Sequence, residues 1–205
     1  MRLRPAPLLS LIALLTAWPA NAVAAVDIDG RIDPAEWQGA RRVTEFRTVQ
    51  PLTGAAPQHP VEGWILATPE GLAVAWRVAM PAGVPRSRQT VQRDFEAQVD
   101  RVNLMVDFDG DARTGYNFTV SSTGGISDAV ITNENNFNDD WDGNWRHAVS
   151  EDEHGWSAEA LIPWYIAPMR GGSDGQRRLR VQLDRVIGAT GERAAWPGAS
   201  FERPR

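Results

Sequence analysis

The feature that most constrains the fold is an alternation of apolar and polar residues that recurs along the chain. In the stretch LAVAWRV, Leu72, Val74, Trp76 and Val78 fall on one side of an extended backbone. Successive side chains of a strand point to opposite faces, so this period predicts half-buried strands and argues against helices. The same alternation is found in four further stretches: Val102–Phe108, Tyr116–Val120, Trp156–Ile162 and Leu179–Leu183.

Turn residues separate these short strands. Val61–Ala67 is the expected hairpin partner of the Trp76 strand, through the turn Thr68–Gly71. Asp109-Gly110 marks a second turn, between VNLMVDF and GYNFTV. The pattern predicts an all-β fold, an antiparallel β-sandwich of immunoglobulin or jelly-roll type with one face of each sheet exposed to water.

One short helix is expected near the mature N-terminus. In Asp33-Pro34-Ala35-Glu36 the aspartate can cap the first turn, proline suits the first helical position, and Glu36 can reach back as in a capping box. Trp37 would then anchor this turn on the sandwich.

The first residues predict a targeting segment. Arg2 and Arg4 precede the apolar run Leu8–Trp18, which is too short to span a bilayer, and small residues follow. We therefore expect residues 1–24 to be a signal peptide, and residues 26–203 to form one domain that is periplasmic or extracellular.

Composition restricts the partners. The chain has no cysteine, so its stability must come from a packed core. Its formal net charge of -5 becomes -7 once the two arginines of the leader are removed. A negatively charged surface disfavours nucleic acid and anionic lipid, which leaves neutral ligands and metal cations.

No catalytic constellation emerges. Cysteine chemistry is excluded, no serine stands in a nucleophile elbow, and the three histidines lack zinc-ligand spacing. Asp139, Asp140 and Asp142 are too close together in one loop to act as the separated pair of a glycosidase. We predict a protein that is not an enzyme.

Asp107, Asp109 and Asp111 resemble the opening of a calcium-binding loop, with carboxylates at alternate positions. The EF-hand pattern fails, because the sixth position is Ala112 and the twelfth is Phe118. Two interpretations remain, a calcium site of another type or a turn at the end of a strand.

Tryptophan is abundant, with nine residues in the chain. Alternating or capped segments hold Trp37, Trp64, Trp76 and Trp156, which we expect to pack in the core. The loop NNFNDDWDGNW instead surrounds Trp141 and Trp145 with amides and with carboxylates such as Asp142. An indole face suits the C–H face of a sugar, while amides and carboxylates suit its hydroxyls. The alternative is that both indoles cover the open end of the core.

The order of motifs resembles the family 9 carbohydrate-binding module, including modules that precede an outer-membrane β-barrel in exported bacterial proteins. The opening IDG-x-ID-x-x-W is followed by D-x-V-x-x-x-x-D and R-x-GY-x-F. The matching stretches are Ile28–Trp37, Val61–Val78, Arg93–Asp128, Trp141–Trp145, Gly155–Trp164 and Arg180–Pro197.

This resemblance implies a non-catalytic module that binds the ends of xylan- or cellulose-type polysaccharides in support of their breakdown or uptake. A glycoside hydrolase or an outer-membrane β-barrel is the implied partner. Of the two tryptophans that sandwich a terminal sugar in the family, one corresponds to Trp196 and the other falls near Phe95. Trp141 or Trp145 is the candidate substitute, and Arg93, Asp94 and Asp100 are placed for polar contacts. A structural role at the entry of the strand is the alternative for Asp100.

Two other functions stay open. The chain could be an interaction or plug domain of an outer-membrane transport protein, without sugar binding. It could also be a haem-binding sandwich, since related folds carry haem through methionine, histidine or lysine. Lysine is absent from this chain, whereas Met80, Met105 and Met169 are present.

Overall fold

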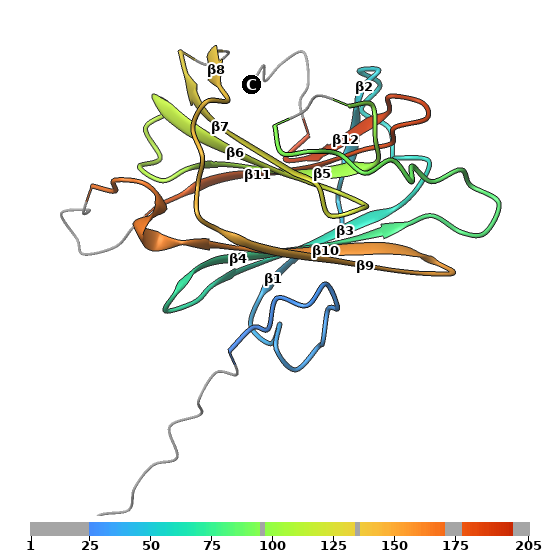
Figure 1. The fold of residues 1–205 in the computed structure, drawn as a ribbon, viewed down its shortest axis with the longest axis horizontal. Helices are drawn as coiled ribbons and strands as arrows, with labels where there is room; N and C mark the ends of the chain where they lie inside the picture. The colour runs from blue at the N-terminus through green and yellow to red at the C-terminus, as the bar shows by residue number, and fades with distance from the viewer. Residues whose placement is uncertain (1–24, 95–96, 134–135, 171–177, 199–205) are drawn as a thin grey trace, which may run out of the picture.

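The computed structural model describes residues 25–94, 97–133, 136–170 and 178–198. Two antiparallel sheets stack face to face (Figure 1). The five-stranded sheet has the order β1-β3-β4-β10-β9 and the seven-stranded sheet the order β2-β12-β11-β5-β6-β7-β8. The predicted β-sandwich is therefore confirmed. The expected signal peptide lies outside the described residues.

The strands of the five-stranded sheet are β1 (Arg41–Val43), β3 (Val61–Ala67), β4 (Gly71–Ala79), β9 (Arg146–Asp152) and β10 (Gly155–Pro163). The strands of the seven-stranded sheet are β2 (Arg47–Gln50), β5 (Arg101–Asp107), β6 (Thr114–Ser121), β7 (Ile126–Thr132), β8 (Asn136–Asn138), β11 (Arg180–Val186) and β12 (Arg193–Trp196). A 3-10 turn, η1 (Trp164–Ile166), follows β10. Within the described residues, no helix is long and apolar enough to cross a bilayer.

The main core fills the space between the sheets, and the alternating residues supply it. Trp76 of β4 and Trp156 of β10 are 1% exposed and face Leu104, Phe118 and Leu183 of the other sheet. Pairing of β3 with β4 places Ala67 opposite Leu72, which confirms the hairpin. The hydroxyl of Thr68 donates to Gly71 O and accepts from Gly71 N, which closes its turn.

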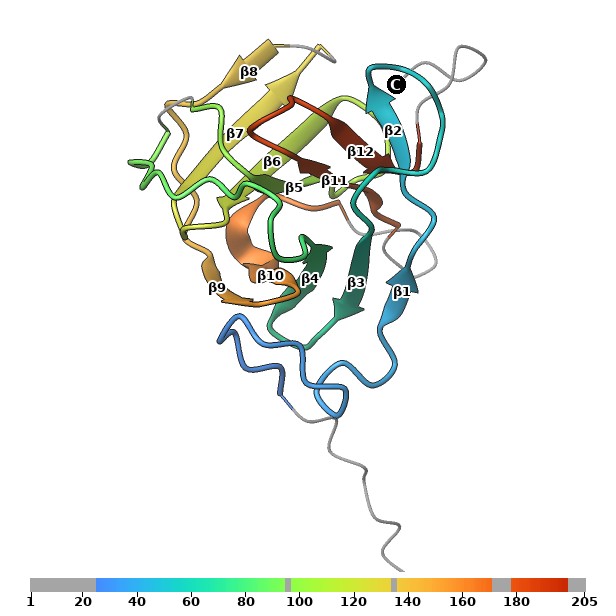
Figure 2. The same ribbon diagram turned by 90° about the vertical axis from the view of Figure 1, so that its right-hand side faces the viewer.

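A second, smaller core lies on the outer face of the five-stranded sheet. The segment from residue 25 to residue 40 crosses this face (Figure 2). Val26 and Trp37 of that segment pack against Ala73, Ala75 and Leu161. The predicted anchoring role of Trp37 is thus correct, and the indole is 4% exposed.

Glu159 of β10 joins this segment to the sheet by hydrogen bonds. Its Oε2 accepts from the backbone N–H of Gly30 at 2.8 Å and of Asp29 at 3.1 Å, and its Oε1 accepts from Trp37 Nε1 at 2.9 Å. Gly30 has φ +86 and approaches β9 so closely that a Cβ would lie 2.5 Å from the carbonyl carbon of Val149. Gly30 of the IDG motif therefore allows the N-terminal segment to pack closely against β9 and β10.

The helix expected at Asp33–Glu36 was wrong, because this part of the chain forms turns only. Asp33 does cap, since its Oδ1 accepts from Ala35 N at 2.8 Å. Glu36, however, accepts from Asp27 N and does not close a capping box. Gly39, at φ +84, takes the chain into the left-handed region before a second helical turn can form.

Candidate functional site

A groove of about 710 Å³ lies over the outer face of the seven-stranded sheet, and we refer to it as the sheet groove. Its floor is the outward-facing half of the alternation, the side chains on the face opposite to the buried Val102, Leu104 and Phe118. The floor residues are Asn103 and Met105 of β5, Asn117 and Thr119 of β6, and Ser127 and Ala129 of β7. Gln50 and Arg193 lie toward one end, Phe137 and Asp139 toward the other, and Val91, Asp94, Ala97, Gln98 and Val99 form a wall.

Hydrogen bonds connect the floor across four strands. Asn117 Nδ2 donates to Thr119 Oγ1 at 3.1 Å, and Thr119 Oγ1 donates to Asn103 Oδ1 at 2.7 Å. Asn103 Nδ2 then donates to Asp184 Oδ1 of β11, which also lies 3.5 Å from Arg193 Nε of β12. Asn103 and Asp184 are 3% and 1% exposed, so this chain is held rigidly within the sheet.

Two polar atoms of the floor remain available to a ligand. Among the described residues, neither Asn117 Oδ1 nor Ser127 Oγ has a hydrogen-bond partner, and both side chains are half-buried in the groove. An amide oxygen accepts and a hydroxyl can do both, which matches the hydroxyl groups of a neutral ligand. The volume falls in the usual range for small-molecule sites.

Asp100 fixes the wall of the sheet groove to the body of the protein. Its Oδ2 accepts from Ser87 N at 2.7 Å and its Oδ1 from Gly188 N at 2.8 Å, and the side chain is 1% exposed. Asp100 therefore has a structural role and not the polar contact to sugar that the resemblance implied, because both of its carboxylate oxygens already accept from backbone N–H groups.

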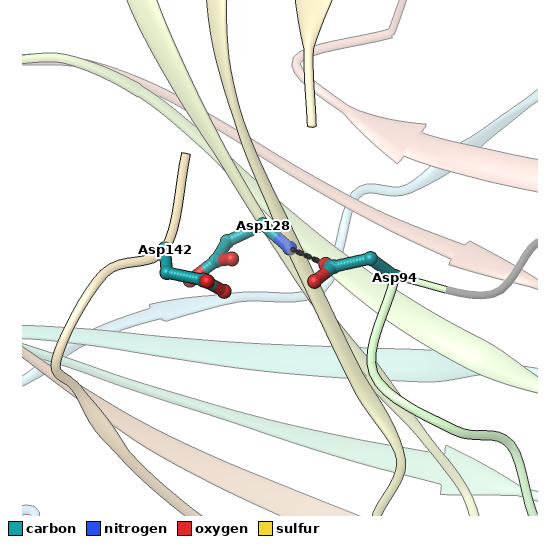
Figure 3. A group of neighbouring side chains, drawn as sticks. All are labelled: Asp94, Asp128 and Asp142. Carbon is teal, nitrogen blue, oxygen red and sulfur yellow. Dashed lines mark hydrogen bonds between the residues drawn. The ribbon is translucent and has the colours of Figure 1, made fainter. Parts of the chain in front are cut away.

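An arginine lies among three carboxylates beside the groove wall (Figure 3 shows the carboxylates). Arg93 forms ion pairs with Asp128 at 2.8 Å, Asp142 at 2.5 Å and Asp94 at 3.4 Å. Burial lowers the pKa of Arg93, but the charges of Asp128, Asp142 and Asp94 outweigh burial and raise that pKa above its ordinary value. The cluster ties the groove wall to β7 and to the loop before β9.

Asp128 is the buried member of this cluster. It lies on the core side of β7, opposite Phe118, and is 0% exposed. Its Oδ2 accepts from Trp145 Nε1 at 2.7 Å and from Gly143 N at 3.0 Å, in addition to the ion pair with Arg93. The WDGNW motif is therefore bound to the sheet through one carboxylate.

The three indoles proposed for sugar contact occupy other places. Trp145 is 7% exposed and belongs to the main core. Trp141 is half-buried and packs edge-to-face on Tyr116 and Phe118, at centroid distances of 5.2 and 6.1 Å. Both indoles thus cover the open end of the core, the alternative given above.

Trp196 lies at the other end of the sandwich. It pairs with Leu183 and so faces the core side of the sheet, where it is half-buried under the guanidinium of Arg41 at 4.8 Å. Trp141, Trp145 and Trp196 therefore do not line the sheet groove. Phe95 lies outside the described residues, whereas its neighbour Asp94 does line the groove.

The carboxylates of the calcium-like loop are used locally. Asp107 accepts from the backbone N–H of Asp109, Gly110 and Ala112 at 2.7–3.1 Å, as a turn at the end of β5 requires. Asp109 and Asp111 each lie 3.3 Å from the guanidinium of Arg170. Among the described residues, the carboxylate oxygens that converge closely enough to hold a metal ion come from Asp94, Asp128 and Asp142.

The methionines considered as haem ligands are dispersed. Met80 is 0% exposed in the main core between the two sheets. Met105 lies on the outer face of the seven-stranded sheet, on the floor of the sheet groove. Met169 packs against the core near η1.

Sequence reasoning missed the floor residues as a site. The alternation identifies four outward-facing polar residues, which on its own predicts only a face exposed to water: Asn103, Asn117, Thr119 and Ser127. The sequence carries no signal for the wall, which depends on contacts between distant segments, such as those of Asp100 with Ser87 and Gly188.

Neither a family model nor any curated protein matches this sequence. Solved structures do match. A family 9 carbohydrate-binding module from Caldicellulosiruptor kristjanssonii, in complex with glucose, superposes with a TM-score of 0.55 at 16% identity, over 83% of this chain and 79% of that one. The chain has the fold of a family 9 carbohydrate-binding module.

Two further matches agree. The cellotriose complex of a family 9 module from the same organism has a TM-score of 0.54 at 16% identity, over 83% of this chain and 77% of that one. A protein from Bacteroides uniformis that is a candidate carbohydrate-binding protein has a TM-score of 0.54 at 14% identity, over 79% of this chain and 81% of that one. At 14–16% identity, these matches establish a common arrangement of the strands, which is the fold alone.

Proposed function

We propose that this family 9-like chain is a non-catalytic carbohydrate-binding module that binds neutral glycans of the xylan or cellulose type in the sheet groove. The observation that carries the proposal is the floor of that groove, where amides and hydroxyls are fixed by hydrogen bonds and two polar atoms remain available. The fold adds support, because neighbours with the same arrangement of strands bind glucose and cellotriose.

The leader-like residues 1–24 support export, so we place the module in the periplasm or outside the cell. There it would deliver polysaccharide to a glycoside hydrolase or to an outer-membrane uptake protein.

Isothermal titration tests the proposal directly. Xylan and cellulose oligosaccharides are expected to release or absorb heat on mixing with the purified protein, and the protein alone is expected to release no reducing sugar. A folded protein that binds no glycan would contradict the proposal and favour an interaction domain. Hydrolysis by the purified protein would contradict its non-catalytic character.

Asn117→Leu is expected to weaken glycan binding about tenfold, which corresponds to about 1.4 kcal/mol. The substitution removes the available Oδ1 and the bond to Thr119 on a half-buried side chain. Tyr165→Ala is the matched control, since Tyr165 is 73% exposed on η1 and lies outside the sheet groove. Equal affinity of the two variants, measured by titration, would remove Asn117 from the site.

We also infer that a metal bound by this protein would take the cluster of Asp94, Asp128 and Asp142. Their oxygens lie within 4.8 Å of one another, and hard carboxylate oxygens favour calcium. Arg93 forms ion pairs with all three, so the cation has to compete with its guanidinium.

Arg93→Gln tests this competition. The variant is expected to melt below the wild type because three carboxylates then repel one another, and 5 mM CaCl₂ is expected to restore several degrees of Tm. Wild type should respond less, and MgCl₂ should restore less than CaCl₂. If calcium does not change the Tm of the variant, the three carboxylates do not bind calcium and serve only to bind Arg93.

A further inference from the structure

We propose that the sheet groove binds an internal segment of a glycan chain, with contacts toward both edges of the seven-stranded sheet, and does not select a chain end. This inference rests on the proposed function, because it concerns the ligand of the same groove. It departs from the chain-end recognition that the family resemblance implied.

The first observation is the extent of the groove across the sheet. Gln50 comes from β2 and Phe137 from β8, and these two strands are the edges of the seven-stranded sheet. Neighbouring strands lie about 4.8 Å apart, so the six steps from β2 to β8 span roughly 25–30 Å. A single sugar ring is several times shorter than this distance. A ligand that fills the groove from edge to edge has several linked rings.

The second observation is the spread of the polar groups. Asn103, Asn117 and Thr119 lie at the centre, on β5 and β6. Gln50 and Arg193 lie toward the β2 edge, and Asp139 toward the β8 edge. Recognition of a chain end needs hydrogen-bonding groups gathered around one terminal ring. Groups at the centre and toward both edges instead fit a ligand that continues in both directions.

The third observation is the aromatic ring toward the β8 edge. Phe137 pairs with Ile131, which places it on the groove side of the sheet, and it is 48% exposed. An exposed aromatic face can stack on the C–H face of a ring, whichever position that ring has in the chain. The ring of Phe137 therefore supplies a contact distant from the amide floor.

Charge supports a neutral chain. The buried carboxylate of Asp184 lies beside Arg193, and Asp94 and Asp139 line the groove. Arg101 and Arg193 also line the groove and balance the charges of Asp94 and Asp139. A lining without net charge does not attract a polymer of acidic sugars, whereas neutral hydroxyls can donate to its carboxylates. The ligand class is therefore a neutral, linear polysaccharide.

Titration with a series of oligosaccharides tests the proposal. Xylose and glucose oligomers of two to six units are compared with the same oligomers reduced at their terminal ring with borohydride. Affinity is expected to rise at least about tenfold from the dimer to the pentamer or hexamer, and reduction is expected to change the Kd of the hexamer less than about twofold. A dimer that binds as tightly as the hexamer, or loss of hexamer binding on reduction, would overturn the proposal.

Two edge variants give an independent readout. Gln50→Ala and Phe137→Ala are each expected to weaken hexamer binding several-fold, because they remove contacts toward opposite edges of one groove. Tyr165→Ala again serves as the exposed aromatic control. An effect confined to one edge would indicate chain-end recognition. Absence of binding to every oligomer by the folded protein would instead refute the proposed function and this inference with it.

Discussion

Asp128→Ala is expected to lower the free energy of unfolding by about 2–5 kcal/mol, because each buried donor that loses its acceptor costs about 1–3 kcal/mol. The carboxylate is 0% exposed and serves Arg93, Trp145 Nε1 and Gly143 N together. Its loss leaves a buried indole N–H and a backbone N–H without an acceptor. Urea unfolding followed by tryptophan fluorescence measures the change, provided that the slope of the transition is unchanged.

Asp142→Ala is the matched control for this experiment. Asp142 contacts the same guanidinium, but its side chain is 68% exposed. Exposed ion pairs contribute about 0–1 kcal/mol, so this variant is expected to stay close to the wild type. If both variants lose the same small amount, Asp128 is not the anchor of the WDGNW motif.

The second large effect is a dependence of stability on pH that originates at Glu159. Burial is the main cause that raises the pKa of Glu159, to about 7, although Trp37, Gly30 and Asp29 donate hydrogen bonds that lower it. Below pH 4.5 the carboxyl is protonated in both the folded and the unfolded chain, so it makes no difference to stability. Between pH 4.5 and 7 the folded chain retains a proton that the unfolded chain releases, so stability falls as pH rises.

The full loss is about 3 kcal/mol and is complete above pH 7, since each pKa unit corresponds to about 1.4 kcal/mol. Comparison with Glu159→Gln isolates the effect, because glutamine does not titrate while the other groups remain. The difference in unfolding free energy between wild type and variant is expected to shift by this amount between pH 4.5 and 8, to the disadvantage of the wild type. A difference that is constant over this range would contradict the raised pKa.

Local patterns predicted the strands well because a strand that buries one face has apolar residues at every second position. Leu72 to Val78 alternate for that reason, and β4 forms with the hairpin partner that the turn Thr68–Gly71 indicated. The helix at Asp33–Glu36 failed because a cap and a proline start a turn but do not lengthen it. Gly39 then ended it within a few residues.

The site was harder to predict than the fold. The loop around Trp141 and Trp145 has the composition of a displayed surface, yet Asp128, a residue of another strand, binds Trp145 Nε1 and draws that indole into the core. Such a contact has no local signature. Asn103 and Asn117 were evident as polar residues in the sequence. Their position in a walled groove could not be predicted, because the wall comes from distant segments of the chain.

The opposite use of the two outer sheet faces has a practical consequence. The segment that begins at residue 25 lies over the five-stranded sheet, and the seven-stranded sheet forms the far side of the sandwich (Figures 1 and 2). The sheet groove lies over the outer face of that seven-stranded sheet. A probe surface, resin or fluorophore attached ahead of Val26 would leave the groove turned toward solution. Immobilised in that orientation, the protein can be presented to insoluble fibres as well as to dissolved oligomers.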